Sequence, residues 1–497
     1  MSFLLAIDQG TTSSRAIAFD HQGQAIFAFN KEHKQHYPKA GYVEHDPTEI
    51  WDNVSEVCQR VVESPKIQGW GNIAAIGITN QRETVVAWDS INGKILYNAI
   101  VWQCRRTTEM VEALVQDGYS SLIKEKTGLV PDAYFSGTKM KWLLDNVDAV
   151  KTAFKKETLR FGTVESYLIY QMSGSHVTDV SNASRTMLFD LTQKEWSADL
   201  MEILGIPEWS LPQLIPNMVH DPEGRAWNRS GREVPILGIA GDQQSALFGQ
   251  SCFNDGDNKI TYGTGNFSLT NTGSSPKISE NGLLTTVAWS LDSISNMTYA
   301  LEGSVFITGA LVQWLRDEMR FFDKASDIEK LAREARAEDD LVIVPAFVGL
   351  GAPYWNQRAR GSILGITRGT GREDIALAAL ESIALQTYDL VTLMEEESGS
   401  KLCTIRVDGG ACKNNLLMEM QSNLLNQEVV RPKNTETTAL GAAFLAGLGA
   451  GMWADLDDLR MLNPPETTFK PDPNYPRERK ITYWKEAVQR SLDWVRK

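Results

Sequence analysis

The first apolar stretch of the chain covers residues 3–7, and a polar, glycine-containing segment, 8–15, follows it directly. Apolar and polar positions then alternate through residues 16–20. Alternation is the period of a strand with one buried face, whereas a short polar segment with glycine is typical of a turn. The beginning of the chain therefore predicts a strand, a tight turn and a second strand.

The same order of patterns returns near the middle of the chain. An apolar run, 234–240, enters the polar segment 241–244, and residues 259–262 enter a glycine-rich segment, 263–265, before a further run at 266–270. We expect strand–turn–strand units here as well.

Helical spacing of apolar residues dominates the last quarter of the chain. It predicts helices over 375–394 and 415–425, with a short strand at 405–407 before the second one. The uncharged segment 437–454 is rich in alanine and glycine, which favours a closely packed buried helix over a membrane span. A last amphipathic helix is predicted by Ile481, Trp484, Val488, Leu492 and Val495. Alternating strands and helices favour an α/β fold.

The chain has 497 residues, enough for two large domains or roughly three average ones. No low-complexity linker and no tandem repeat divides it. Because the strand–turn–strand theme starts again in the middle, we place a domain boundary near residue 250.

Composition narrows the functional classes. With 49 basic and 63 acidic side chains the net charge is −14, the wrong sign for general nucleic-acid binding. Five cysteines without a CxxC pair favour a reducing compartment, and no Cys/His cluster has zinc spacing. No basic stretch precedes the first apolar run, so we expect a cytoplasmic protein without integral membrane contact.

Three loops could bind phosphate, although the usual phosphate-loop motifs are absent. They are the segments 8–15, 263–265 and 408–411. Taken alone, each is more simply an ordinary turn. Together they suggest two halves that clamp a nucleotide, as in actin-like ATPases, with Asp8 binding Mg²⁺ through water.

The combined motifs are specific enough to indicate a family. The chain resembles the FGGY carbohydrate kinases of the actin-like ATPase superfamily, and the glycerol kinases among them, over nearly its whole length. The matching segments include Asp8-Gln-Gly-Thr-Thr-Ser-Ser-Arg15, Gly77-Ile-Thr-Asn-Gln-Arg-Glu-Thr84, Val101-Trp-Gln-Cys-Arg-Arg106, Ser181-Asn-Ala-Ser-Arg-Thr186, Gly241-Asp-Gln-Gln244, Tyr262-Gly-Thr-Gly265, Gly349-Leu-Gly-Ala-Pro-Tyr-Trp355, Asp408-Gly-Gly-Ala411 and two family signature regions, 134–146 (with Lys139 and Trp142) and 361–381.

This resemblance implies two actin-like (ribonuclease H-like) α/β domains with a central cleft. Residues 1–248 would contain the polyol site and the first phosphate loop, and residues 249–497 the second phosphate loop and the adenosine site. The implied reaction is the phosphorylation of glycerol by ATP, with Mg²⁺, to sn-glycerol 3-phosphate. A homodimer or homotetramer is the implied assembly.

For the polyol, Arg82 and Glu83 offer a rigid donor and an acceptor in a loop between two apolar runs. The resemblance adds hydroxyl contacts from Tyr134, Asp242 and Gln243. It also implies an apolar wall that is formed by Trp102 and Phe267. Without the resemblance, the charged pair would be a surface ion pair and the aromatic residues core packing.

For the reaction, the resemblance implies that Asp242 is the general base, with Asp8 and Asp242 as the metal partners. The implied phosphate contacts are Thr11, Thr12, Ser13, Arg15 and Thr264. The residues expected nearer the nucleoside are Gly309, Gln313, Gly410, Ala411 and Asn414.

Two other functions stay open. A sibling kinase would act on a pentulose or another polyol. An actin-like ATPase that works as a filament or chaperone is the more distant alternative, because Arg82, Glu83 and Trp102 have no evident task in it.

Overall fold

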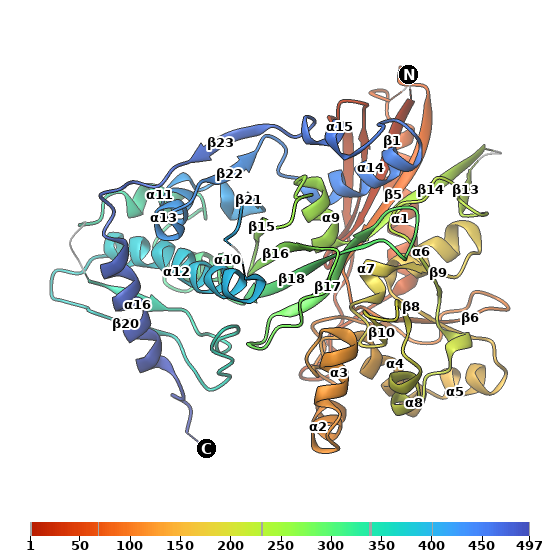
Figure 1. Ribbon diagram of the computed structural model, residues 1–497, viewed down its shortest axis with the longest axis horizontal. Helices are drawn as coiled ribbons and strands as arrows, with labels where there is room; N and C mark the ends of the chain where they lie inside the picture. The colour runs from red at the N-terminus through yellow and green to blue at the C-terminus, as the bar shows by residue number, and fades with distance from the viewer. Residues whose placement is uncertain (1, 68, 230–231, 337–339, 400, 497) are drawn as a thin grey trace.

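In the computed structural model, the protein is built around two β-sheets (Figure 1). The structure describes residues 2–67, 69–229, 232–336, 340–399 and 401–496. We call the part built around the sheet that contains the N-terminal strand the first lobe, and the part around the other sheet the second lobe.

The first sheet has the strand order β13-β14-β5-β1-β2-β3. Strands β1, β2 and β3 form two successive antiparallel hairpins, whereas β5 and β14 run parallel to β1. The predicted first two strands are confirmed, but the turn is shorter than predicted because Asp8 already pairs with Arg15 in the ladder. The strands are β1 Ser2–Gln9, β2 Ser13–Phe19, β3 Ala25–Glu32, β5 Asn72–Asn80, β13 Ala226–Arg229 and β14 Arg232–Gly241.

The second sheet has the strand order β17-β18-β16-β15-β21-β22-β23. Its segment β18-β16-β15-β21-β22 repeats the arrangement of β3-β2-β1-β5-β14, with three antiparallel strands followed by two parallel ones. The two sheets thus repeat one topology, in line with the strand–turn–strand pattern that returns in the middle of the sequence. The strands are β15 Asp257–Tyr262, β16 Asn266–Gly273, β17 Leu284–Ser290, β18 Met297–Val305, β21 Thr404–Asp408, β22 Val429–Pro432 and β23 Pro465–Phe469.

Two helices, α9 (Asp242–Gly249) and α14 (Thr437–Gly449), pack together between the sheets, and α14 also contacts β1, β5 and β14 (Figure 1). The contact is too close for side chains. A Cβ on Gly77 would lie 2.1 Å from the carbonyl oxygen of Ala442, and one on Gly441 would lie 1.8 Å from that of Ser245. The predicted buried helix is confirmed, although it ends at Gly449, before the expected residue 454.

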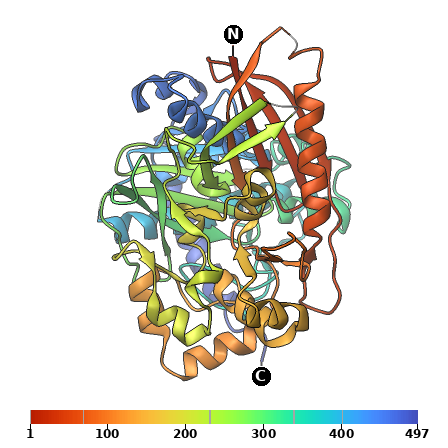
Figure 2. The ribbon, with the colours of Figure 1, turned by 90° about the vertical axis from the view of Figure 1, so that its right-hand side faces the viewer.

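The rest of the first lobe consists of helices and short strands outside its main sheet. Helix α1 (Pro47–Val62) runs along β2 and β3 (Figure 2). The other elements are β4 Glu44–His45, β6 Val86–Asp89, β7 Ala99–Ile100, α2 Thr108–Gln116, α3 Ser120–Thr127, α4 Ser136–Asn146, α5 Asp148–Lys155, β8 Leu159–Gly162, α6 Val164–Ser173, β9 Val177–Asp179, α7 Val180–Ala183, β10 Phe189–Asp190, β11 Glu195–Trp196, α8 Ala198–Leu204, η1 Glu208–Ser210 and β12 Gln213–Ile215.

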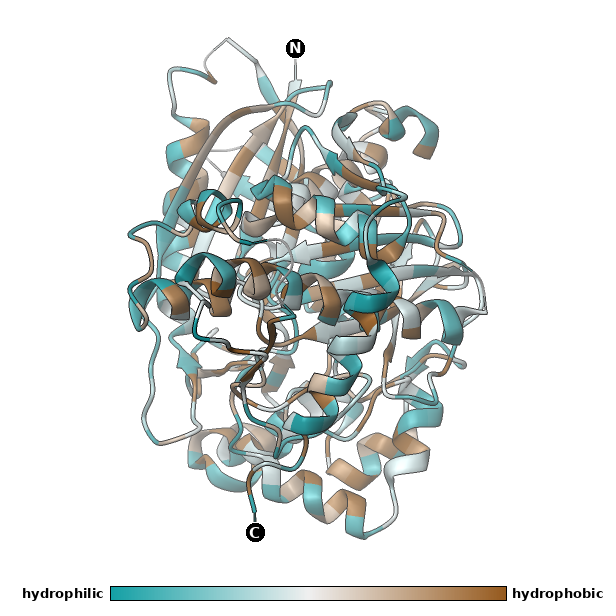
Figure 3. Cartoon of the chain, turned by 90° about the vertical axis from the view of Figure 1, so that its left-hand side faces the viewer, coloured by the Kyte–Doolittle hydropathy of each residue, from teal (hydrophilic) through white to brown (hydrophobic). Residues whose placement is uncertain are grey.

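Helices also cover the second sheet, and apolar and polar stretches alternate along the helices of this side (Figure 3). The predicted helices at 375–394 and 415–425 are confirmed. The last helix ends at Ser491, so Leu492 and Val495 lie beyond it, contrary to the prediction. The elements are α10 Gly309–Asp317, α11 Asp327–Ala332, β19 Val342–Val344, β20 Ser362–Leu364, α12 Arg372–Ser398, η2 Gly410–Lys413, α13 Asn415–Leu425, α15 Leu456–Arg460 and α16 Arg477–Ser491.

One helix among the described residues, α12, is long and apolar enough to cross a membrane by length and composition alone. Of its most apolar 18-residue window, 78% is buried inside the protein. It is therefore a core helix of the second lobe. All five cysteines are free thiols in the structure.

Candidate active site

Asp242 is the first residue of α9, directly after β14. The segment 241–244 is thus a strand-to-helix junction and not the predicted turn between strands. Glycine is required at position 241 because a Cβ there would lie 2.7 Å from Cδ of Arg82.

Oδ1 of Asp242 lies 3.2 Å from Nε of Arg82 and accepts a hydrogen bond from the backbone N–H of Gln243 at 2.7 Å. Oδ2 has no hydrogen-bond partner within the described part of the chain, and 32% of the Asp242 side chain is exposed. Oδ2 is therefore available to a ligand.

Four charged side chains are buried together beside Asp242: Arg82, Glu83, Arg185 and Glu302. Arg82 donates from Nη1 and Nη2 to the two oxygens of Glu302, at 2.5 and 2.8 Å. Arg185 donates from Nη2 to Glu302 at 3.1 Å and from Nε to Glu83 at 2.7 Å. Arg82 and Glu83 are thus neither a surface pair nor each other's main partner. The guanidinium fork of Arg82 is held in place by Glu302.

The charges in this cluster compensate each other. Burial raises the pKa of Glu83, and the two arginines oppose that rise. For Glu302 burial acts in the same direction, but Arg185 and Arg82 outweigh it and hold the pKa at about 2. Glu302 is therefore ionised at neutral pH. Paired in this way, two arginines and two glutamates form a rigid polar platform inside the protein.

Trp102 and Tyr134 stand next to this platform, and both are half-buried. Their rings meet edge-on with centroids 5.6 Å apart, and the guanidinium of Arg185 lies 5.8 Å from the Tyr134 ring centroid. The indole Nε1 of Trp102 donates to Oγ1 of Thr11 at 3.0 Å, which links the predicted polyol wall to the first hairpin tip. Phe267, the other predicted wall residue, is half-buried on β16 opposite Ser304 of β18.

Lys139 fixes the backbone of the loop that carries Glu83. It is fully buried and donates to the carbonyl oxygens of Glu83, at 3.1 Å, and of Tyr134. Burial lowers its pKa to about 7, although Glu83 counteracts that effect. Glu83 has φ +60°, a left-handed conformation that this contact helps to hold.

No role was predicted for Arg185, Glu302 or Lys139, although Arg185 and Lys139 lie in motifs that carried the resemblance. One feature of the sequence could have drawn attention to Glu302. It is a single charged residue that follows the uncharged stretch 299–301 within β18. Nothing local could identify its two partners, which lie 220 and 117 residues away in the chain.

The tip of the β1–β2 hairpin carries Thr11, Thr12 and Ser13. Gly10 donates to the carbonyl of Ser13 at 2.9 Å and closes the turn. Of the three, Thr12 is exposed and the others are half-buried. Their backbone and hydroxyl groups can therefore reach phosphate oxygens.

Arg15, in contrast, forms an ion pair with Glu436, the residue that precedes α14. Across the hairpin, Asp8 has its pKa raised to about 7, first by burial and then by the charge of Asp242. Two carboxylates thus act on each other at this point. No group of three or more His, Cys, Asp or Glu in the described ranges could hold a metal. Mg²⁺ keeps several of its waters when bound, so a pair of carboxylates suits it.

In the second lobe, Thr264 and Gly309 meet at the tip of the β15–β16 hairpin. The N–H of Gly309 donates to the carbonyl of Gly263 at 3.0 Å, and a Cβ on Gly309 would lie 2.4 Å from that oxygen. Thr264 is exposed, as is Gln313 one turn further along α10. Backbone groups therefore line this part of the site.

The third loop follows β21, next to β15. Gly409 has φ +82°, and a Cβ there would lie 2.5 Å from the carbonyl oxygen of Tyr262, whereas Gly410 faces open space. Ala411 is half-buried. Asn414 caps α13, because its Oδ1 accepts from the N–H of Leu417 at 2.9 Å. The structure thus brings Gly410 close to the Thr264 hairpin, but it gives Asn414 a structural contact of its own.

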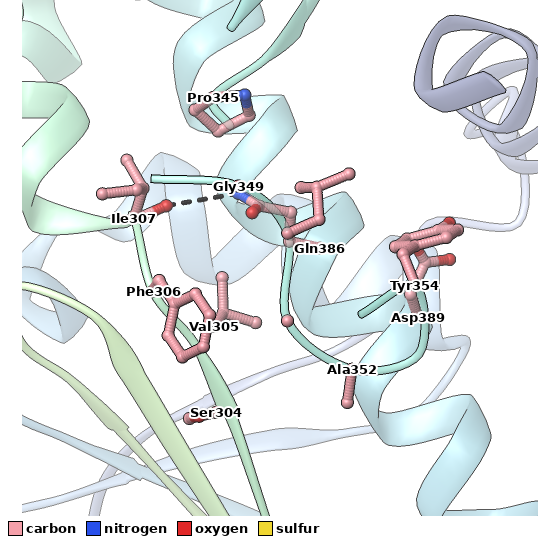
Figure 4. Close-up of a pocket in the computed structure, with 12 residues that line it drawn as sticks. Ser304, Val305, Phe306, Ile307, Pro345, Gly349, Ala352, Tyr354, Gln386 and Asp389 are labelled. Carbon is pink, nitrogen blue, oxygen red and sulfur yellow. Dashed lines mark hydrogen bonds between the residues drawn. The ribbon is translucent and has the colours of Figure 1, made fainter. Parts of the chain in front are cut away.

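A separate small cavity of about 10 Å³ lies beside β18, and no predicted site residue lines it (Figure 4). Gln386 lines it and donates to the carbonyl of Ile307 at 3.2 Å. At its edge, Asp389 Oδ2 accepts from Tyr354 at 2.7 Å and from Trp484 at 2.6 Å, and burial raises the pKa of Asp389 to about 6. A cavity of this size holds at most about one water, so it belongs to the core of the second lobe.

Comparisons with known proteins agree with this architecture. The model of the N-terminal domain of the FGGY family of carbohydrate kinases matches residues 3–249, and that of the C-terminal domain matches residues 258–450.

Similar relatives include glycerol kinase 2 of Thermotoga maritima, 52% identical over the full length of both chains. A second is the glycerol kinase of Thermococcus onnurineus, 52% identical over 99% of each chain.

Among solved structures, the glycerol kinase of Plasmodium falciparum with ADP has a TM-score of 0.93 at 35% identity, covering 99% of this chain and 98% of that chain. Xylulose kinase from Lactobacillus acidophilus, with a TM-score of 0.87 at 24% identity over 99% and 98% of the two chains, shares the fold. This chain belongs to the FGGY family of carbohydrate kinases.

Proposed function

We propose that this protein is an ATP-dependent kinase of glycerol that forms sn-glycerol 3-phosphate. The observation that carries the proposal is the position of Asp242, where one carboxylate oxygen is held by the buried Arg82 and the other has no hydrogen-bond partner among the described residues. The glycerol kinases that resemble the chain over its full length support the choice of substrate.

Glycerol has three hydroxyls on a short carbon chain. We propose that the hydroxyls meet Arg82, Glu83, Tyr134, Asp242 and Gln243, and that the CH groups pack against Trp102 and Phe267. Buried polar groups of this kind discriminate strongly, since a substrate that lacks a hydroxyl leaves them unpaired.

In the reaction, the terminal hydroxyl oxygen of glycerol attacks the γ-phosphorus of ATP, and Oδ2 of Asp242 takes the proton of that hydroxyl. The bond between the γ-phosphorus and the β,γ-bridging oxygen breaks, and ADP leaves. Because Arg82 fixes Oδ1, the base is oriented before the substrate arrives, which is the main contribution that a protein makes to phosphoryl transfer.

The hairpin tips would hold the triphosphate, through Thr11, Thr12, Ser13, Arg15 and Thr264. The nucleoside would lie against the second lobe, near Gly309, Gln313, Gly410, Ala411 and Asn414. Asp8 and Asp242 would hold Mg²⁺, whose charge offsets that of the phosphate oxygens.

We further propose that residues 1–248 and 249–497 are the two domains, and that the enzyme works in the cytoplasm as a homodimer or homotetramer. Light scattering on the purified protein measures the assembly. A monomer at micromolar concentration would contradict this part of the proposal.

A coupled assay of ADP release tests the substrate, with glycerol, dihydroxyacetone, erythritol, xylulose and ribulose in parallel. We expect the highest kcat/KM for glycerol. A preference for a pentulose would instead indicate a sibling sugar kinase. ATP hydrolysis that needs no polyol and accompanies sedimenting polymer would indicate a filament-forming ATPase.

A further inference from the structure

Lys259 is a fully buried lysine that neither the motifs nor the proposed mechanism uses. It lies on β15, in register between Leu269 of β16 and Arg406 of β21. Burying an ammonium group is costly unless it is paired and hydrogen-bonded. The residues around Lys259 should therefore supply hydrogen-bond acceptors or negative charges for its ammonium group.

The ammonium group of Lys259 makes two hydrogen bonds, to Oε1 of Gln243 at 2.5 Å and to Oγ1 of Thr261 at 2.9 Å. Burial lowers its pKa, and Asp408, Asp242 and Glu302 act in the opposite direction. Gln243 lies in the first turn of α9 in the first lobe, beside Asp242. The bond from Lys259 therefore crosses from the second lobe to the residue next to the proposed base.

This contact decides which way the Gln243 amide points. An ammonium group has only donors, so Gln243 must turn its oxygen toward Lys259 and its NH₂ away. Within the described ranges, Nε2 of Gln243 has no hydrogen-bond acceptor, and the residue is half-buried. The side chain thus faces the site with a donor only, whereas its neighbour Asp242 offers an acceptor.

We infer that Lys259 is a positioning residue for the polyol: it locks the Gln243 amide so that Nε2 donates to a hydroxyl oxygen of the substrate. This inference rests on the proposed function. The side chains at 242 and 243 then form an adjacent acceptor and donor, a pattern that matches two hydroxyls of one small alcohol.

A double-mutant cycle tests the inference with the full-length enzyme. Lys259→Met replaces the apolar stem of the side chain with one of similar shape and removes the donor, and Gln243→Ala removes the amide. We expect each variant to raise KM for glycerol by about tenfold and to leave KM for ATP nearly unchanged. Lys259→Met loses the hydrogen bond to Gln243, Gln243→Ala loses the proposed hydrogen bond to the substrate, and about tenfold is the usual effect of one such bond. Because both act through one amide, the double variant should resemble Gln243→Ala alone.

Two outcomes would overturn the inference. One is a double variant whose KM is the product of the two single effects. The other is a Lys259→Met enzyme that loses affinity for ATP as much as for glycerol. Lys470→Met is the matched control, because that lysine is exposed on the surface and pairs with Glu428.

Gln243→Glu decides the matter if Lys259→Met does not fold. The new carboxylate keeps the contact with Lys259 as an ion pair but cannot donate to the substrate. We expect a melting temperature at least equal to that of the wild type and a raised KM for glycerol. An unchanged KM would refute the donor role. If the wild type itself does not phosphorylate glycerol, the proposed function fails and not this inference alone.

Discussion

The two halves of the site are built from different chemistry, although the two sheets share one topology. The proposed polyol half consists of charged side chains that are buried and paired across the two lobes, such as Arg82 of the first lobe and Glu302 of β18 in the second. In the second lobe, the proposed nucleotide half consists of backbone groups near Gly309 and Gly409, where an added Cβ would lie only 2.4 and 2.5 Å from a carbonyl oxygen. A small neutral alcohol must be selected by matched donors and acceptors, whereas phosphate can be bound by N–H groups of any close-fitting loop.

The largest expected effect comes from Asp242→Asn, which breaks the polyol half at its reactive atom. The amide can still accept from Arg82, but it cannot take a proton. We expect kcat to fall by roughly 10²- to 10⁴-fold, the usual range for a general base.

For this variant, calorimetry with ADP should give an affinity close to that of the wild type. That result would locate the loss in the chemical step. Near-normal turnover would exclude Asp242 as the base.

Glu302→Gln breaks the buried cluster without changing its shape. It leaves Arg82 and Arg185 with Glu83 as the only buried anion of the group. Removing one partner of a buried pair costs about 3–5 kcal/mol, so urea should unfold the variant at a clearly lower concentration.

The effect should depend on pH in a definite direction. The folded pKa of Glu302, about 2, lies below its usual 4.5, so the contribution of Glu302 is complete above about pH 4.5 and disappears as the pH falls toward 2. The stability difference between wild type and Glu302→Gln should therefore shrink in acid. A difference that grows on acidification would contradict the ion pairing described here.

The sequence predicted the strands and helices better than the pairing of the buried charges, and the reason is physical. Hairpins and helices follow local periodicity, so β1, β2, α12 and α13 were predicted from short windows. The three glycine loops also lie within single segments of sequence. The bounds of loops and helices were predicted less accurately. Composition does not show where strand pairing begins, and pairing of Asp8 with Arg15 makes the first turn shorter than predicted.

The polyol half depends on partners that are far apart in the chain. A motif placed Arg82 and Glu83 in the site, but no local pattern shows that Arg82 grips Glu302 or that Lys259 meets Gln243. The choice of partner is settled only when the two lobes come together. This is why the pairing of these residues was not predicted from the sequence.

Gly309→Ala tests the nucleotide half. The added methyl group would lie 2.4 Å from the carbonyl oxygen of Gly263, so the hairpin tip with Thr264 must move. We expect KM for ATP to rise by about tenfold, while KM for glycerol at saturating ATP changes little. Steady-state kinetics in both substrates measure this.

Gly69→Ala is the control for that variant, because a Cβ at position 69 meets no atom within 4 Å. If Gly309→Ala weakens glycerol binding as much as ATP binding, the two halves are not separate in function. The two halves would then differ in the groups that form them but not in the substrate that each one binds.

The smallest expected effect concerns the ion pair between Arg15 and Glu436, whose side chains are 31% and 53% exposed. In the absence of nucleotide Glu436 competes for the cation that we assign to a phosphate, so Glu436→Gln should release Arg15. Exposed pairs contribute at most about 1 kcal/mol, so KM for ATP should fall by no more than about fivefold and stability should hardly change. The gain should also diminish at high salt, because screening already weakens the pair in the wild type. A higher KM for ATP in this variant would mean that Glu436 helps to place Arg15, and the first hairpin would then also depend on paired side chains, as the polyol half does.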